Sequence, residues 1–223
     1  MTDFVLVHGA WGGAFTWGEI PDLLRARGHR VLAPDLPGLG ARRGELHPGI
    51  TLSDHVADIC RQIATAGFDH FVLAGHSYGG MVVTGVATRL GARIDTLAYC
   101  DAFLPQDGES LWDITGDWEH RAYIDGQKFT PGLVAPIFPG LPSDWRHPLL
   151  TMTEALRFTG EEAKVAARAY LFASGWRPTP FARFAERVRA DPVWRYAEVG
   201  CGHDVMGEAT GATLAFLLEA AAK

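Results

Sequence analysis

The sequence has few cysteines and no long apolar run. Its 223 residues include three cysteines, Cys60, Cys100 and Cys201, which are odd in number and far apart in the chain. A disulfide framework is therefore not expected, and a reducing, cytoplasmic environment fits this usage best. No apolar run approaches the roughly 18 residues that a membrane-spanning helix needs. Residues 1–4 lack the basic region of a signal peptide, so we expect the chain to begin directly in a strand.

The chain also lacks an excess of basic residues and the common binding motifs. A net charge of −6 and a pI near 5.8 argue against nucleic acid and anionic membranes as partners. The nine histidines show no His-x-x-x-His spacing and the cysteines no Cys-x-x-Cys, so no metal site is expected. Neither Gly-x-Gly-x-x-Gly nor the Gly-Lys-Ser/Thr of a P-loop is present, which argues against nucleotide binding. At 48% apolar and 21% charged residues, the composition is that of one soluble globular domain.

A serine flanked by glycines follows a short apolar run. Residues 71–74 are apolar, and the chain then reads Gly75-His76-Ser77-Tyr78-Gly79 before a helical stretch over residues 81–87. A strand that turns sharply into a helix strains the residue at the bend, and its neighbours two positions away must be very small. The pattern favours Ser77 as a nucleophile, with the amide N–H of Tyr78 directed at a developing oxyanion. An ordinary structural serine is the alternative.

Apolar stretches alternate with amphipathic ones through most of the chain. The pattern predicts strands over residues 4–7, 31–33, 71–74, 94–100, 169–173 and 194–199. It predicts helices over residues 15–27, 51–66, 81–87, 161–168, 181–189 and 207–221, with Thr51 capping the second. Such alternation is typical of an α/β fold, in which a mostly parallel sheet carries helices on both faces. Ligands then bind at the carboxyl ends of the strands.

One long stretch departs from this alternation. From Pro105 to Pro148 the chain holds six of its 13 prolines and three of its seven tryptophans. An irregular insertion of this length is usually functional. We therefore interpret residues 1–223 as a single domain with a cap inserted at about residues 105–160, over the mouth of the site. The alternative is a surface excursion whose aromatic residues only pack down onto the domain.

Three strand ends carry groups that suit acyl transfer. Ser77, Asp101 and His203 follow in the order nucleophile, acid and base, and glycines at 200 and 202 precede the histidine. His203 would take the serine proton and return it to the leaving group, while Asp101 would hold the imidazole. An Asp101 that only orders the local backbone is the alternative to this role. Asp191 and Asp204 remain alternative acids, although Asp204 adjoins the histidine and Asp191 lies at a helix end.

The motifs together resemble one superfamily along essentially the whole chain. They are His8-Gly9-Ala10-Trp11, Gly75-His76-Ser77-Tyr78-Gly79-Gly80, the stretch 99–105, and Gly202-His203-Asp204. The sequence resembles the α/β-hydrolases, in the small carboxylesterase branch. It is similar to plant methyl esterases and hydroxynitrile lyases, and still more to bacterial pyrethroid-hydrolase-like esterases. The resemblance implies an α/β-hydrolase fold, an oxyanion hole formed by the amides of Ala10 and Tyr78, and no cofactor.

The chain departs from the family at the position of the acid. Many members carry a carboxylate after the strand that matches residues 169–173, where this chain reads Ser174-Gly175-Trp176-Arg177-Pro178. Haloalkane-dehalogenase-like relatives place an acid after the preceding strand, where this chain has Asp101. The resemblance therefore agrees with Asp101, already indicated by its strand end, as the predicted acid.

We therefore predict a cofactor-free serine hydrolase that cleaves a neutral, fairly hydrophobic carboxylic ester through an acyl-enzyme. Trp11, Trp112 and Phe138 are predicted to line its substrate site. A hydroxynitrile-lyase-like or haloperoxidase-like enzyme on the same triad, or a ligand receptor on a hydrolase fold, is the alternative. The threonine and lysine of the lyases are replaced by Gly9 and Asp204. The partner is a small-molecule ester, and the pattern does not distinguish a monomer from a homodimer.

Overall fold

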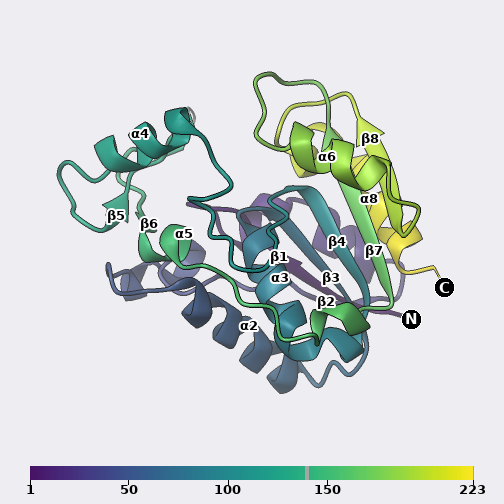
Figure 1. The fold of residues 1–223 in the computed structure, drawn as a ribbon. Helices are drawn as coiled ribbons and strands as arrows, with labels where there is room; N and C mark the ends of the chain where they lie inside the picture. The colour runs from purple at the N-terminus through teal and green to yellow at the C-terminus, as the bar shows by residue number, and fades with distance from the viewer. Residues whose placement is uncertain (139–140, 223) are drawn as a thin grey trace.

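A six-stranded parallel sheet forms the centre of the computed structural model, which describes residues 1–138 and 141–222 (Figure 1). The strand order is β2-β1-β3-β4-β7-β8, and every neighbouring pair is parallel. The strands are β1 Asp3–Val7, β2 Arg30–Leu32, β3 Phe71–Ser77, β4 Ile94–Ala102, β7 Ala167–Ala173 and β8 Trp194–Val199. All six strands predicted from the sequence are therefore present, and β3 and β4 lie side by side at the middle of the sheet.

Side chains of each central strand alternate between two apolar cores. Phe4 and Leu6 of β1 belong to one core, and Val5 and Val7 belong to the other, as the pleat of a strand requires. Helices α2, α3 and α6 cover one face, and helices α1, α7 and α8 cover the other. The helices are α1 Ile20–Arg25, α2 Leu52–Ala66, α3 Gly79–Leu90, α6 Ala182–Arg189, α7 Val205–Glu208 and α8 Thr210–Ala220. The predicted α/β architecture, with helices on both faces, is confirmed.

Helix α2 begins and ends where its sequence predicts. The Thr51 side chain accepts a hydrogen bond from the amide of Asp54, and the Asp54 carboxylate accepts one from the amide of Thr51. This reciprocal capping box satisfies N–H groups that a helix start leaves without partners. Gly67 ends the helix in the left-handed conformation, with φ of 65°.

Three predicted helices differ from the observed ones. The predicted helix 15–27 is divided into a 3₁₀ turn, Ala14–Trp17, and α1, because Gly18 adopts φ of 53° between them. The predicted helix 161–168 is wrong apart from a 3₁₀ turn at Glu162–Lys164, since β7 already pairs with β4 from Ala167 onward. The last helix is interrupted at Ala209, whose φ of −138° separates α7 from α8.

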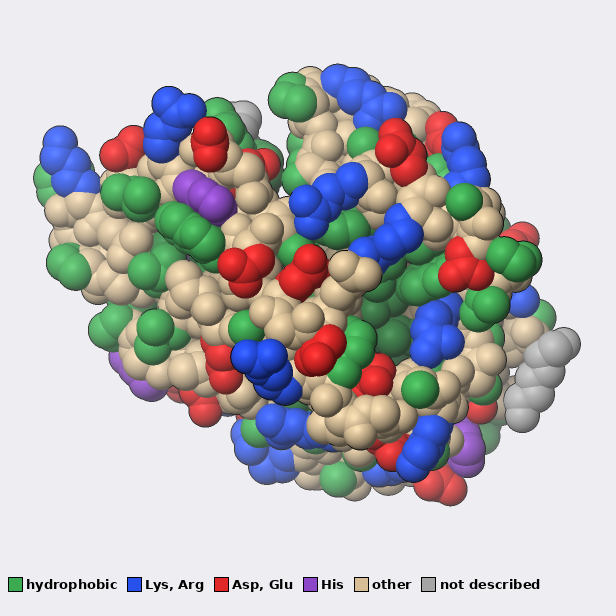
Figure 2. Space-filling model, viewed as in Figure 1, with side chains coloured by type: hydrophobic (Ala, Val, Ile, Leu, Met, Phe, Trp, Pro, Cys, Tyr) green, Lys and Arg blue, Asp and Glu red, His purple; other side chains and the backbone are tan. Residues whose placement is uncertain are grey.

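The segment between β4 and β7 leaves the sheet and forms short elements of its own. They are α4 Asp117–Asp125, β5 Leu133–Val134, β6 His147–Pro148 and α5 Leu150–Thr153, with β5 and β6 paired antiparallel. In Figure 1, α4 and β5 stand apart from the sheet. Figure 2 shows the surface hollowed between the part that carries α4 and the part that carries α6.

The surface charges and the lengths of the helices complete the description of the fold. On the face drawn in Figure 2, acidic and basic side chains are interspersed rather than gathered by sign. Within the described ranges, none of the helices combines the length and the apolar character needed to cross a membrane.

Candidate active site

Ser77 lies at the bend between β3 and α3 and has φ of 54°, a conformation that non-glycine residues seldom adopt. A Cβ added to Gly75 would lie 2.6 Å from the carbonyl oxygen of Gly79. A Cβ added to Gly79 would lie 2.5 Å from the carbonyl oxygen of Val7. Both glycines are therefore required sterically, and the close packing holds Ser77 in its strained conformation.

A buried carboxylate meets the imidazole of His203. Asp101, fully buried at the end of β4, places Oδ2 2.7 Å from His203 Nδ1. The same carboxylate accepts hydrogen bonds from the amide of Ala173 at Oδ1 and from the indole Nε1 of Trp176 at Oδ2, each 3.2 Å long. An acceptor-only group surrounded by three N–H donors requires that His203 carry its proton on Nδ1. The Nε2 atom is then free to accept a proton.

Burial dominates the protonation of this pair. It lowers the pKa of His203 from 6.5 to about 4, because the charged imidazolium loses solvation. Burial also raises the pKa of Asp101, and the N–H groups of Ala173, Trp176 and His203 oppose that rise by hydrogen bonding to the ionised carboxylate. The neutral imidazole is the form that acts as a base.

The imidazole of His203 is held among aromatic rings. It stacks on Phe181 with ring centroids 5.0 Å apart and planes at 14°. The ring of His76 lies 4.5 Å away, and its Nε2–H donates a 3.0 Å hydrogen bond to the carbonyl oxygen of His203. Burial lowers the pKa of His76 to about 3, so this ring is neutral too. No hydrogen bond joins Ser77 to His203 among the described residues, and such contacts often tighten only when substrate is bound.

The two alternative acids make other contacts. Asp191 is exposed and accepts a 3.0 Å hydrogen bond from the amide of Val193. Asp204 caps α7 by accepting a 3.0 Å hydrogen bond from the amide of Gly207. Of the three carboxylates considered from the sequence, Asp101 alone is hydrogen-bonded to His203.

The glycine-rich loop after β1 packs against the nucleophile. A Cβ added to Gly9 would lie 2.9 Å from Ser77 Cβ. Trp11, at φ of 58°, donates its amide N–H to His147 Nδ1 at 3.3 Å and its indole N–H to the carbonyl oxygen of Val134 at 2.8 Å. Since His147 and Val134 belong to β6 and β5, the segment between β4 and β7 fixes this loop.

The two amides expected to form an oxyanion hole belong to Ala10, in the loop after β1, and to Tyr78, the residue after Ser77, and both residues line one cavity with Ser77. Within the described part of the chain, neither the N–H of Ala10 nor that of Tyr78 donates a hydrogen bond. The Tyr78 ring is anchored because its hydroxyl lies 2.9 Å from His55 Nδ1, while His55 Nε2 donates to the carbonyl oxygen of Pro37. That carbonyl can only accept, so the Tyr78 hydroxyl is the donor to His55.

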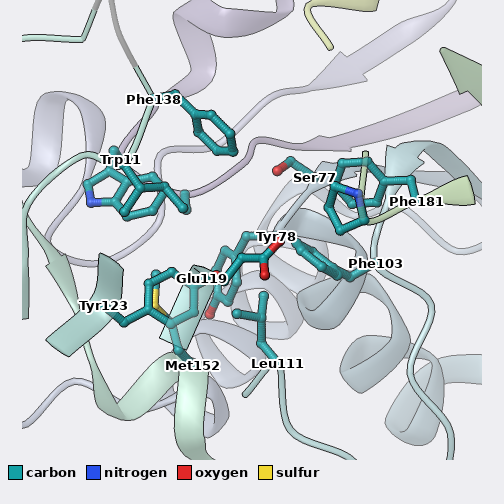
Figure 3. A pocket seen from close by; sticks show the side chains of 13 residues that line it. Trp11, Ser77, Tyr78, Phe103, Leu111, Glu119, Tyr123, Phe138, Met152 and Phe181 are labelled. Carbon is teal, nitrogen blue, oxygen red and sulfur yellow. The ribbon is translucent and has the colours of Figure 1, made fainter. Parts of the chain in front are cut away.

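A narrow cavity opens beside Ser77 (Figure 3). Its walls are mostly apolar and aromatic and come from the loop after β1, the elbow, the segment between β4 and β7, and the start of α6. The lining residues are Ala10, Trp11, Ser77, Tyr78, Phe103, Leu111, Glu119, Tyr123, Ile137, Phe138, Met152, Pro180 and Phe181. Trp11 and Phe138 thus line the cavity and contact each other edge to face, with ring centroids 6.5 Å apart.

Trp112 occupies a different place from the other two predicted lining residues. It stacks on His120 with ring centroids 3.9 Å apart, and its carbonyl oxygen accepts the Nε2–H of that histidine at 2.7 Å. It lines a separate hollow with Ile124 and Leu149. The cavity beside Ser77 does not include Trp112.

Sequence reasoning missed two residues of the site. Trp176 stands where many relatives carry the acid, and it donates a hydrogen bond to Asp101 instead. Glu119 lines the cavity from the first turn of α4, within the stretch where the sequence predicts no regular element. No local signal distinguishes either residue, because both roles depend on how distant segments pack. In the ranges 1–138 and 141–222, no cluster of three or more histidine, cysteine or acidic side chains could hold a metal ion.

Comparison with known proteins agrees with this geometry. Residues 4–216 match the profile described as the alpha/beta hydrolase family. The chain is 36% identical over 230 residues to the carbendazim hydrolyzing esterase of Nocardioides sp. (strain SG-4G), covering 92% of this chain and 94% of the relative. It is 33% identical over 109 residues to methylesterase 2 of Arabidopsis thaliana, covering 48% and 41% of the two chains.

A solved structure extends the likeness in fold. The pyrethroid hydrolase from Sphingobium faniae JZ-2 superposes with a TM-score of 0.77 at 18% identity, over 99% of this chain and 98% of the other. The resemblance inferred from the motifs, to carboxylesterases, plant methyl esterases and pyrethroid hydrolases, is therefore confirmed.

Proposed function

This chain belongs to the alpha/beta hydrolase family and is a carboxylic ester hydrolase, and we propose that it acts as a serine esterase through an acyl-enzyme on Ser77. The observation that carries the proposal is the 2.7 Å contact between Asp101 Oδ2 and His203 Nδ1 at the sheet edge where Ser77 is held at the elbow. A nucleophile, a base and a group that orients the base then lie at the carboxyl ends of β3, β8 and β4, along one edge of the sheet.

Each residue has one task in the proposed reaction. His203 Nε2 takes the proton of Ser77 Oγ as the oxygen attacks the ester carbonyl. The amides of Ala10 and Tyr78 donate to the oxygen that becomes negative, and Asp101 stabilises the imidazolium that forms. His203 then returns the proton to the departing alcohol. A water molecule, activated by the same histidine, hydrolyses the acyl-enzyme and releases the acid.

The cavity supports a fairly hydrophobic substrate without a negative charge. Trp11, Phe138 and Phe181 offer apolar surface and no partner for an anion. The crowding of Gly9 against Ser77 also disfavours a lyase of the hydroxynitrile type, because the threonine those enzymes carry would need the space that is missing.

A burst of alcohol release should reveal the acyl-enzyme. With an excess of a p-nitrophenyl ester, rapid mixing should show p-nitrophenol released in an amount close to that of the enzyme, followed by a slower steady rate. A panel of p-nitrophenyl and methyl esters of increasing acyl length identifies the substrate for this measurement. Absence of turnover with every ester would contradict the proposed function and favour a ligand receptor on the same fold.

Activity should persist into mildly acidic solution. Because burial disfavours the imidazolium of His203, the base stays neutral below the ordinary pKa of 6.5. The His203 side chain is 22% exposed and pairs with Asp101, and both features favour the charged imidazolium. The acid limb of kcat/KM should therefore have its midpoint between about pH 4 and pH 6.5. The pH dependence of kcat/KM reports this value for the free enzyme. Asp101 must also stay ionised over this range, which its three N–H donors favour, so an acid limb centred above 6.5 would contradict the prediction.

A further inference from the structure

One carboxylate stands in the otherwise apolar wall of the cavity. Among the lining residues that the structure describes, Glu119 is the sole acidic or basic side chain. It comes from the first turn of α4, and in Figure 3 its carboxylate points in among the apolar side chains of the cavity. A half-buried acid in such a place needs either a structural reason or a ligand.

Helix capping explains the position of one of the two carboxylate oxygens of Glu119. Glu119 Oε2 accepts a 2.9 Å hydrogen bond from the amide of Gly116 and so caps α4. Its Oε1 atom has no hydrogen-bond partner among the described residues. Glu119 and Tyr123 both line the cavity, and the nearby charge of Glu119 adds to burial in raising the pKa of the Tyr123 hydroxyl.

A ligand that fills the cavity must satisfy or desolvate this oxygen. A substrate group with only C–H bonds would remove water from the carboxylate without replacing its hydrogen bonds, and an anionic group would be repelled. An N–H group would donate a charge-assisted hydrogen bond, while the rest of the substrate contacts the aromatic walls.

We propose that Glu119 is a specificity-determining residue that selects esters carrying an uncharged N–H donor on the part that enters the cavity. This inference rests on the proposed esterase function. The substrate class is thus an aromatic or similarly apolar ester with one amine, amide or ring N–H remote from the bond that breaks. Trp11 and Phe138 would supply apolar contact to such a substrate, and Glu119 would supply the acceptor.

A matched set of esters tests the proposal. Methyl phenylacetates with a para methyl, amino or carboxylate group have the same scaffold, and the methylene keeps the substituent away from the ester. The wild-type kcat/KM should be about 10-fold higher for the amino ester than for the methyl ester, as one charge-assisted hydrogen bond provides. The wild-type kcat/KM for the carboxylate-substituted ester should be about 10-fold lower than for the methyl-substituted ester.

Two variants separate the acceptor from the charge. Glu119→Leu should remove the preference for the amino ester, whereas Glu119→Gln retains an acceptor and should keep part of it. Both should improve turnover of the carboxylate ester relative to the methyl ester. Asp117→Asn removes the same charge from the exposed side of α4 and should leave all ratios unchanged. Activity of each variant on the methyl ester shows that it has folded.

The outcomes distinguish this inference from the function on which it rests. If wild type hydrolyses the methyl ester but the amino-to-methyl ratio is the same in wild type and Glu119→Leu, the role of Glu119 is wrong and the esterase proposal stands. If Asp117→Asn changes the ratios as much as the Glu119 variants, the effect is long-range charge and the inference is also wrong. If wild type hydrolyses none of these esters or those of the p-nitrophenyl panel, the proposed function itself fails.

Discussion

Replacing Ser77 with alanine should lower kcat by a factor on the order of 10⁶ and leave the protein folded. The change deletes one oxygen, so the elbow retains its packing, while no other group replaces the nucleophile. The amides of Ala10 and Tyr78 remain and can still stabilise an oxyanion formed by attack of water, which is why some residual rate is expected. Steady-state turnover of the best ester, with thermal unfolding of the same sample, measures both parts of the prediction.

A second serine provides the control for this result. Ser143 is exposed in the segment between β4 and β7 and does not line the cavity, and Ser143→Ala deletes the same hydroxyl oxygen there. Its activity should match that of wild type. A Ser77→Ala enzyme that keeps more than about a hundredth of the wild-type rate would show that another group is the nucleophile.

Asp101→Asn should lower kcat by about 10⁴ with little change in shape. The carboxylate now accepts three N–H groups, from Ala173, Trp176 and His203. An amide has one acceptor oxygen, so its NH₂ group must face one or more of these donors. If the NH₂ faces His203, the imidazole protonates on Nε2 instead and can no longer accept the serine proton. The pH profile and kcat of the variant, measured with the same ester, test this account.

The alternative acids supply the comparison. Asp191→Asn and Asp204→Asn should each retain activity within a few-fold of wild type, because their carboxylates bind the amides of Val193 and Gly207. A loss in either that equals or exceeds the loss in Asp101→Asn would mean that Asp101 is not the orienting acid. The buried contacts of Asp101 would then serve only to hold β4 against β7.

Local sequence predicted the conformation wherever neighbouring residues decide it. Gly75 and Gly79 identified the elbow because only glycine fits there, and Thr51 marked the start of α2 because its side chain caps the helix. The position of Asp101 at the end of a strand made it a candidate acid, since parallel strands end at one edge of the sheet. These features needed no knowledge of distant contacts.

Long-range packing decided the features that the sequence did not reveal. Residues 161–168 read as a helix, yet pairing with β4 makes the chain extended from Ala167 onward. Trp112 is predicted to line the site because it is a large aromatic residue in the inserted segment, but it stacks on His120 instead. Glu119 lies in a stretch where no helix is predicted, yet it caps α4 and faces the cavity, because side-chain direction depends on how the segment between β4 and β7 folds over the sheet.

Covalent labelling tests the central claim most directly. A p-nitrophenyl phosphonate transfers its phosphonyl group to an activated serine and releases p-nitrophenolate. Water does not remove the bound phosphonyl group on the timescale of turnover. Peptide mapping by mass spectrometry should place a single phosphonyl group on the peptide that contains Ser77, with loss of activity in proportion to labelling. Labelling of a different residue, or full hydrolysis by a completely labelled enzyme, would contradict the account.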